Sequence, residues 1–103
     1  ALDAQGGRMY RVEIVSNRSV KDEIVEGLES TMPGILYTVL PQAEGRGKRD
    51  RKLGTTTWPE LNFALFAYVE DSDLAGVRAV VREVKSRFPK EGIAIFAVHA
   101  EAL

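Results

Sequence analysis

Three consecutive stretches decide the fold: ILYTVL at residues 35–40, PQAEGRGKRDRKLGTTTWP at residues 41–59 and LNFALFAYV at residues 61–69. The outer two are apolar runs of strand length, rich in β-branched and aromatic residues. Antiparallel neighbours need only a short turn between them, so the much longer middle stretch has a purpose beyond connection. Its basic residues are Arg46, Lys48, Arg49, Arg51 and Lys52. The pattern predicts two strands joined by a long basic loop that contacts something outside the domain.

Upstream of this region, the sequence predicts a strand and then a helix. Tyr10, Val12 and Ile14 alternate with polar residues, as in a strand with one buried face. Asn17 and Ser19 offer N-cap oxygens, and Ser19 with Asp22 resembles a capping box. The apolar positions of the predicted helix are Val20, Ile24, Leu28 and Met32, and Pro33-Gly34 ends it.

Downstream, the stretch Glu70-Asp71-Ser72-Asp73 supplies caps and negative charge for the start of a second helix. The apolar stripe of that helix consists of Leu74, Val77, Val81, Val84 and Phe88, and residues 93–99 form a last apolar strand. The order is therefore strand, helix, strand, strand, helix, strand. It predicts an α+β, ferredoxin-like βαββαβ fold with a four-stranded antiparallel sheet and two helices on one face. We expect a single domain over residues 9–103, with residues 1–8 an expression remnant or a mobile arm.

The predicted third and fourth strands are apolar on both faces. Phe66 and Tyr68 lie on the face opposite to Phe63 and Leu65, and residues 93–98 are continuously apolar. Two helices cover one face of a sheet, so the other face needs a different cover. Another copy of the chain is the simplest cover, and we expect an oligomer.

The composition excludes several classes of function. The net charge is −1, so attraction to nucleic acid has no basis outside the loop, and we expect no nucleic-acid partner. The chain has no cysteine and one histidine, His99, which argues against thiol chemistry and a multi-histidine metal site. No apolar run is long enough to span a bilayer, and we expect a cytoplasmic protein without membrane insertion. No paired acids and no nucleophile with a base stand out, so the pattern favours a binding protein over an enzyme.

Two interpretations of the glycine pair at the start of the loop are open. Gly45 and Gly47 can allow a turn with positive φ, or their amides can cradle an anion beside Arg46 and Lys48. Trp58 is either the hydrophobic anchor of the loop or a platform for a ligand.

The stretch Glu44-Gly45-Arg46-Gly47-Lys48-Arg49 resembles the Gly-x-Gly-Arg-Gln start of the mobile T-loop in the nitrogen-regulatory P-II signalling family. The length of the chain and its βαββαβ order also resemble that family. The resemblance implies a homotrimer with its sheets packed together, adenine nucleotides in the clefts between subunits, and loops that reach partner proteins. It implies ligand-binding residues at Gly45, Arg46, Gly47, Lys48 and Arg49, and at Lys90 and Gly92 before the last strand.

The chain departs from the family at defined positions. Arg49 stands where the family has glutamine, so the resemblance does not imply that this chain binds 2-oxoglutarate through this position. Residues 88–92 replace the Thr-Gly-x-x-Gly-Asp-Gly-Lys segment that grips phosphate, which leaves Lys90 and Gly92. The chain therefore resembles a divergent P-II-like protein.

The leading hypothesis is a small trimeric regulator that binds an anionic metabolite, ATP, ADP, AMP or another small anion, and acts on a partner protein through its basic loop. A membrane transporter and an enzyme are both open as that partner, and no cofactor is required. One alternative is a trimer that responds to divalent metal and resembles the CutA family. Others are a protein-interaction module without a small ligand and a sheet that binds RNA. The predicted third strand lacks the glycine and the basic residues of the RNA-recognition consensus.

Overall fold

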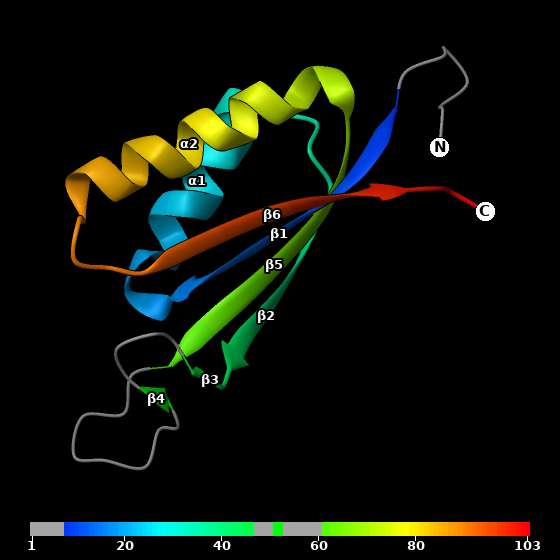
Figure 1. Ribbon diagram of the computed structural model, residues 1–103. Helices are drawn as coiled ribbons and strands as arrows, with labels where there is room; N and C mark the ends of the chain where they lie inside the picture. Colours follow the sequence, from blue (N-terminus) through cyan, green and yellow to red (C-terminus); the bar gives the residue numbers. More distant parts are fainter. Residues whose placement is uncertain (1–7, 47–50, 53–60) are drawn as a thin grey trace.

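The structure is a computed structural model that describes residues 8–46, 51–52 and 61–103. Its elements in order are β1 (Met9–Asn17), the 3₁₀ turn η1 (Arg18–Val20), α1 (Lys21–Thr31), β2 (Tyr37–Ala43), β3 (Gly45–Arg46), β4 (Arg51–Lys52), β5 (Asn62–Glu70), the 3₁₀ turn η2 (Asp71–Asp73), α2 (Leu74–Arg87) and β6 (Ile93–Ala100). The four long strands form one antiparallel sheet in the order β2-β5-β1-β6. Both helices lie on the same side of that sheet (Figure 1). The predicted ferredoxin-like α+β fold is confirmed.

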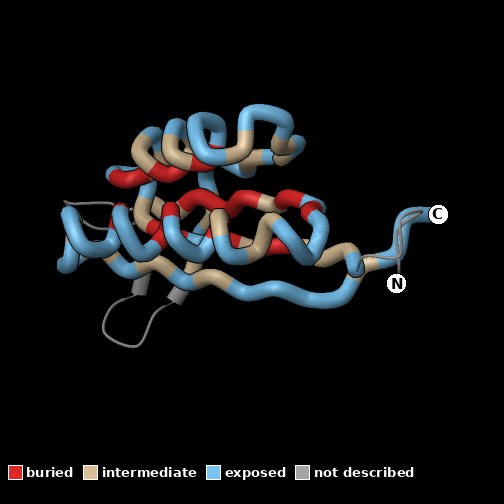
Figure 2. The backbone as a smooth tube through the Cα atoms, turned by 90° about the horizontal axis from the view of Figure 1, so that it is seen from above, coloured by how far each residue is buried: buried red, intermediate tan, exposed pale blue. Residues whose placement is uncertain are grey.

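The core lies between the helices and one face of the sheet. Alternate residues of β1 and β5 point into it, including Val12, Ile14, Phe63 and Leu65, all at most 1% exposed. The helices contribute Val20, Ile24, Leu28, Val77, Val80, Val81 and Val84. Figure 2 shows these buried positions gathered in the middle of the molecule, with exposed backbone around them. Burying this apolar surface is the main favourable term in folding.

Both helices begin after a 3₁₀ turn, and this changes the predicted capping. The side chain of Asn17 accepts a hydrogen bond from the backbone N–H of Ser19 at 2.8 Å. No side chain caps the start of α1, so the predicted capping box of Ser19 and Asp22 is wrong. Because the chain already turns at Arg18–Val20, Asn17 is the last extended residue and occupies the cap position instead.

The second strand extends further than its sequence predicts. Residues 35–40 were expected to end at Pro41, whereas β2 spans Tyr37–Ala43. Proline lacks an N–H donor, but β2 is an edge strand, where a missing donor is tolerated. Its register with β5 also shifts between Leu40 and Ala43, as a bulge around Pro41 requires. The long loop therefore leaves the sheet later than predicted.

Two contacts tie the chain ends and the edge strand to the rest of the domain. The carbonyl of Arg8 accepts a hydrogen bond from the N–H of Asp71 at 2.8 Å, so Arg8 packs with the domain, while residues 1–7 lie outside the described part. The hydroxyl of Tyr37 donates to Glu29 of α1 at 2.5 Å. This hydrogen bond raises the pKa of Tyr37 above its ordinary value, and desolvation and the charge of Glu29 act in the same direction.

Among the described residues, no helix has the length and apolar character that crossing a bilayer requires.

Candidate functional site

The base of the basic loop is a short two-stranded ladder. β3 pairs with β4 in antiparallel register, with Gly45 opposite Lys52 and Arg46 opposite Arg51. We call these four residues the loop-base ladder; it projects from the end of the sheet where β2 and β5 meet the loop (Figure 1). The register thus brings basic residues from the two ends of the loop to opposite positions of the backbone ladder.

Gly45 lies at a close approach between two strands rather than in a turn with positive φ. Its φ does not lie in the left-handed region, and it belongs to an extended strand. A Cβ built on Gly45 would lie 3.2 Å from the side-chain nitrogen of Asn62, the first residue of β5. The interpretation that Gly45 permits a turn with positive φ is therefore wrong. The glycine instead allows the ladder to pack closely against the start of β5.

The other predicted ligand-binding residues fall into two groups. Gly47, Lys48 and Arg49 lie outside the described residues, as does Trp58. Lys90 and Gly92 lie in the exposed turn between α2 and β6, where the N–H of Glu91 donates to the carbonyl of Phe88 at 3.0 Å.

The register places that turn at the same end of the sheet as the ladder. Ile93 pairs with Ser16, and Asn62 pairs with the next residue of β1, Asn17. Strand β1 nevertheless lies between β5 and β6. One copy of the chain therefore does not bring Lys90 and Gly92 into contact with the ladder.

Nothing in the described part of the chain explains a glycine at position 92. Among these residues, a Cβ on Gly92 would meet no heavy atom within 4 Å, and the φ of Gly92 is not in the left-handed region. A close approach by a group outside the described residues is one structural reason for a glycine there.

The face of the sheet away from the helices is apolar, as predicted. We call it the open face. Its large exposed apolar side chains are Val15, Leu40, Tyr68, Phe96 and Val98, each between 37% and 59% exposed, and Phe66 is half-buried among them. These side chains come from all four strands of the sheet, with Arg11 and Glu13 of β1 between the residues of β5 and those of β6.

An ion pair occupies the middle of the open face, and the sequence analysis missed it. Arg11 donates from its Nη2 to Oε2 of Glu13, both on β1, and its guanidinium lies 5.8 Å from the ring centre of Phe66. The alternation of polar and apolar residues along β1 marks Arg11 and Glu13 as part of an ordinary polar face. The predicted strand order would have shown that this face is unusual, because it puts β1 between two strands whose faces away from the helices are apolar.

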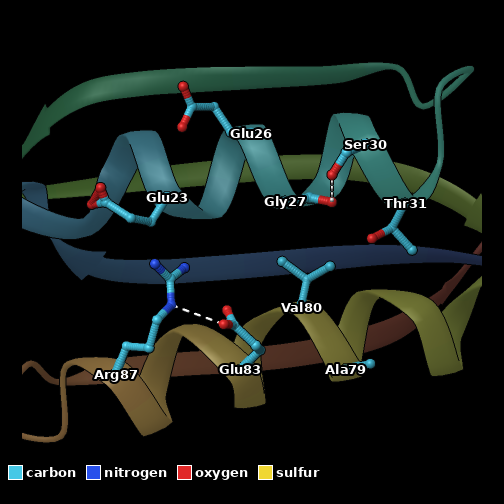
Figure 3. A pocket seen from close by; sticks show the side chains of 9 residues that line it. All are labelled: Glu23, Glu26, Gly27, Ser30, Thr31, Ala79, Val80, Glu83 and Arg87. Carbon is cyan, nitrogen blue, oxygen red and sulfur yellow. Dashed lines mark hydrogen bonds and ion pairs between the residues drawn. The ribbon is translucent and has the colours of Figure 1, made fainter.

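A shallow groove of about 450 Å³ lies between the two helices (Figure 3). It is lined by Glu23, Glu26, Gly27, Ser30, Thr31, Ala79, Val80, Glu83 and Arg87. Arg87 pairs with Glu83 at 2.8 Å and Ser30 donates to the carbonyl of Gly27, so these polar groups have partners within their own helices.

His99 lies on an exposed strand end. Its ring meets that of Tyr10 edge-on at 4.8 Å between centres, and its Nδ1 lies 3.4 Å from a guanidinium nitrogen of Arg8. Within residues 8–46, 51–52 and 61–103, no three histidine, cysteine or acidic side chains are grouped to hold a metal ion. The arrangement favours packing at the sheet end over metal binding.

Comparison with known proteins gives matches among solved structures. No protein-family model matches the chain, and neither does any curated protein. CPII, a nitrogen regulatory PII-like protein from Thiomonas intermedia bound to ADP, AMP and bicarbonate, matches with a TM-score of 0.66 at 13% identity, over 89% of this chain and 87% of its own. A putative PII-like signalling protein from Thermus thermophilus matches with a TM-score of 0.59 at 18% identity, over 89% and 86%. The chain has the fold of PII-like proteins.

This PII-like fold does not by itself determine a function. A de novo designed protein matches with a TM-score of 0.62 at 13% identity, over 90% of this chain and 99% of its own. The βαββαβ scaffold is therefore common to proteins of different origin, and function has to be argued from the site. Beyond the scaffold, this chain has the loop-base ladder and the uncovered apolar face.

Proposed function

We propose that this chain is a PII-like regulatory protein. Three copies assemble through their open faces, an anionic metabolite such as an adenine nucleotide binds between neighbouring copies, and the basic loop of residues 41–59 acts on a partner protein. One observation carries the proposal: the ladder sets Arg46 opposite Arg51 at the end of a sheet whose second face is apolar and uncovered. The PII-like match CPII, which carries ADP, AMP and bicarbonate, supports the choice of ligand class.

The site is placed between copies because one chain does not complete it. The ladder and the turn with Lys90 and Gly92 lie at the same end of the sheet with β1 between them. A neighbouring copy packed on the open face can bring its own ladder to this turn. The unexplained glycine at position 92 supports a close approach there, and Lys90 would add a charge-assisted contact to the bound anion.

The proposed role of the loop is to report the ligand. An anion that pairs with basic residues of the loop would stabilise one arrangement of the loop. A partner that binds that arrangement would sense the metabolite, and either a membrane transporter or an enzyme fits this role. We propose binding and regulation rather than catalysis.

Calorimetry with ATP, ADP, AMP, cyclic AMP and bicarbonate tests the ligand. Replacing both Arg46 and Lys48 by alanine removes two charge-assisted contacts and should weaken binding at least about tenfold. The matched control removes two exposed charges from α2, Arg78→Ala with Lys85→Ala, and should bind like the parent. If none of the five binds at millimolar concentration, or if the loop variant binds like the parent, the sensor proposal fails and a role in protein interaction alone replaces it.

Sedimentation tests the assembly independently. The parent should sediment as a trimer at micromolar concentration, and Phe96→Asp should convert it to monomers because a covered charge without a partner is costly. Leu36→Asp is the matched control, since Leu36 is 82% exposed and lies outside the strands. A parent that is fully monomeric, or a Phe96→Asp variant that remains trimeric, contradicts the proposed assembly.

A further inference from the structure

The ion pair of Arg11 and Glu13 is enclosed by apolar side chains of both neighbouring strands. Glu13 is opposite Phe66 on β5 and opposite Phe96 on β6. Arg11 is opposite Tyr68 and Val98 on the same two strands. A charged pair in the centre of an otherwise apolar face is unusual, because charged residues are depleted from the cores of interfaces.

The pair is not fully satisfied within one chain. The Nε of Arg11 is hidden from solvent and has no hydrogen-bond partner in the described part of the chain. A guanidinium has five N–H donors, and within the described part of the chain Nη2 of Arg11 donates to Glu13. The two side chains are still 40% and 27% exposed, so a second molecule can reach them. An acceptor on a second molecule does not reach the hidden Nε, but it can accept a hydrogen bond from the exposed part of the guanidinium and so stabilise the pair.

We propose that Arg11 of one copy also pairs with Glu13 of the neighbouring copy, and that this contact sets the register in which the sheets of the assembly pack. The inference rests on the assembly proposed above and adds the residues that specify it. A second copy is the occupant that the charges favour, because it presents one base and one acid in the same apolar surroundings. In a symmetric assembly, each copy can then supply the acceptor that its neighbour lacks.

The two parts of the face have different roles in this arrangement. Burying Val15, Leu40, Tyr68, Phe96 and Val98 drives association, but apolar contact has no direction and tolerates sliding. A covered ion pair adds little net affinity, whereas a register that separates its members leaves charges buried without partners. The apolar residues thus supply the affinity, and Arg11 with Glu13 selects one packing.

Charge reversal at the two positions tests the contact between copies. Arg11→Glu leaves two acids on the face, and Glu13→Arg leaves two bases. Each variant alone should assemble at least about tenfold more weakly than the parent, because like charges then meet across the interface. Mixing the two variants should restore assembly in part, because in a mixed trimer two of the three contacts between copies join opposite charges and one still joins like charges. Sedimentation velocity and native mass spectrometry measure these mixed trimers. A pair that acts within one chain alone would give no recovery on mixing.

A double reversal tests the same contact with both charges kept. Arg11→Glu combined with Glu13→Arg should fold, as shown by circular dichroism, and should assemble with itself but not with the parent. Arg78→Glu, an exposed reversal on α2, is the matched control and should mix freely with the parent. Provided that the parent assembles, any of three results overturns this inference and leaves the assembly standing. These results are single reversals that assemble as well as the parent, single reversals that fail to recover on mixing, and a double reversal that mixes freely with the parent. If the parent is a monomer, the proposed assembly itself fails.

Discussion

A close approach of the two helices can be tested by adding one methyl group to Gly27. Gly27 lies inside α1 and faces Val80 of α2, which is 7% exposed. A Cβ on Gly27 would lie 2.7 Å from Cγ1 of Val80. Non-bonded carbons prefer a separation of about 3.5–4 Å, so Gly27→Ala forces the helices or the valine side chain to move.

Two opposing terms determine the size of the effect. Alanine is favoured over glycine inside a helix by about 1 kcal/mol. Overpacking a well-packed interface costs roughly 1–3 kcal/mol. The expected net loss for Gly27→Ala is about 1 kcal/mol, which lowers the Tm of a domain of this size by roughly 4–8 °C. Removing the obstacle in the double variant with Val80→Ala should recover about 1–3 kcal/mol relative to the sum of the single changes.

Thermal and urea unfolding at one fixed protein concentration measure this cycle. Gly76→Ala is the matched control, because Gly76 also lies in a helix at this interface, but its added Cβ would be 3.5 Å from the nearest heavy atom. That is an ordinary contact, so Gly76→Ala should stabilise the protein by up to about 1 kcal/mol. If Gly27→Ala stabilises as much as Gly76→Ala, or if the cycle shows no coupling, the inferred helix contact is refuted.

Three further changes give expected outcomes. Gly92→Ala should leave the Tm unchanged or slightly raised, since nothing lies within 4 Å of the new Cβ, while calorimetry should show weaker ligand binding if the turn faces the proposed cleft. Ser16→Ala should stabilise the fold by about 1 kcal/mol in urea unfolding, because the hydroxyl of Ser16 is buried with no partner in the described part of the chain; a clear loss of stability would reveal a hydrogen bond. The raised pKa of Tyr37 means that its hydrogen bond to Glu29 stabilises the fold below the ordinary tyrosine pKa of 10.0, and that this contribution is lost as the pH rises through the folded-state pKa. Tyr37→Phe should therefore lose less stability than the parent between neutral and strongly alkaline pH, and equal losses in both proteins would count against this contact.

The helices and strands that bury one face and expose the other were predictable from the sequence. Alternation located β1 and β5, and helical spacing located α1 and α2, because burial of one face leaves a regular pattern. Positions that depend on a distant neighbour were not predictable in this way. Val80 was absent from the predicted apolar stripe of α2, yet it is buried because Gly27 of the other helix leaves room for it.

The parts of the candidate site that escaped prediction also depend on partners in space. A ladder of two-residue strands is too short to show any periodicity, so the pairing of Arg46 with Arg51 is not visible in the sequence. The extension of β2 through Pro41 follows from its edge position, which is a property of the whole sheet. The resemblance to the P-II family correctly indicated the fold, while the residues at the loop base remain a proposal.

The two proposed surfaces, the open face and the loop-base ladder, differ in the signs of the charged residues that they pair. On the open face, Arg11 and Glu13 have opposite signs and neutralise each other, so this part of the molecule attracts neither anions nor cations over a distance. Such a pair acts at contact range, where it rewards one alignment of two surfaces and penalises others. In the ladder, Arg46 and Arg51 have the same sign and occupy opposite backbone positions. Like charges in one place do not specify a register, but they favour the binding of an anion. In the two proposals, arginine thus serves assembly on the sheet, where an acid is its partner, and ligand binding at the loop base, where a second arginine lies opposite in the register.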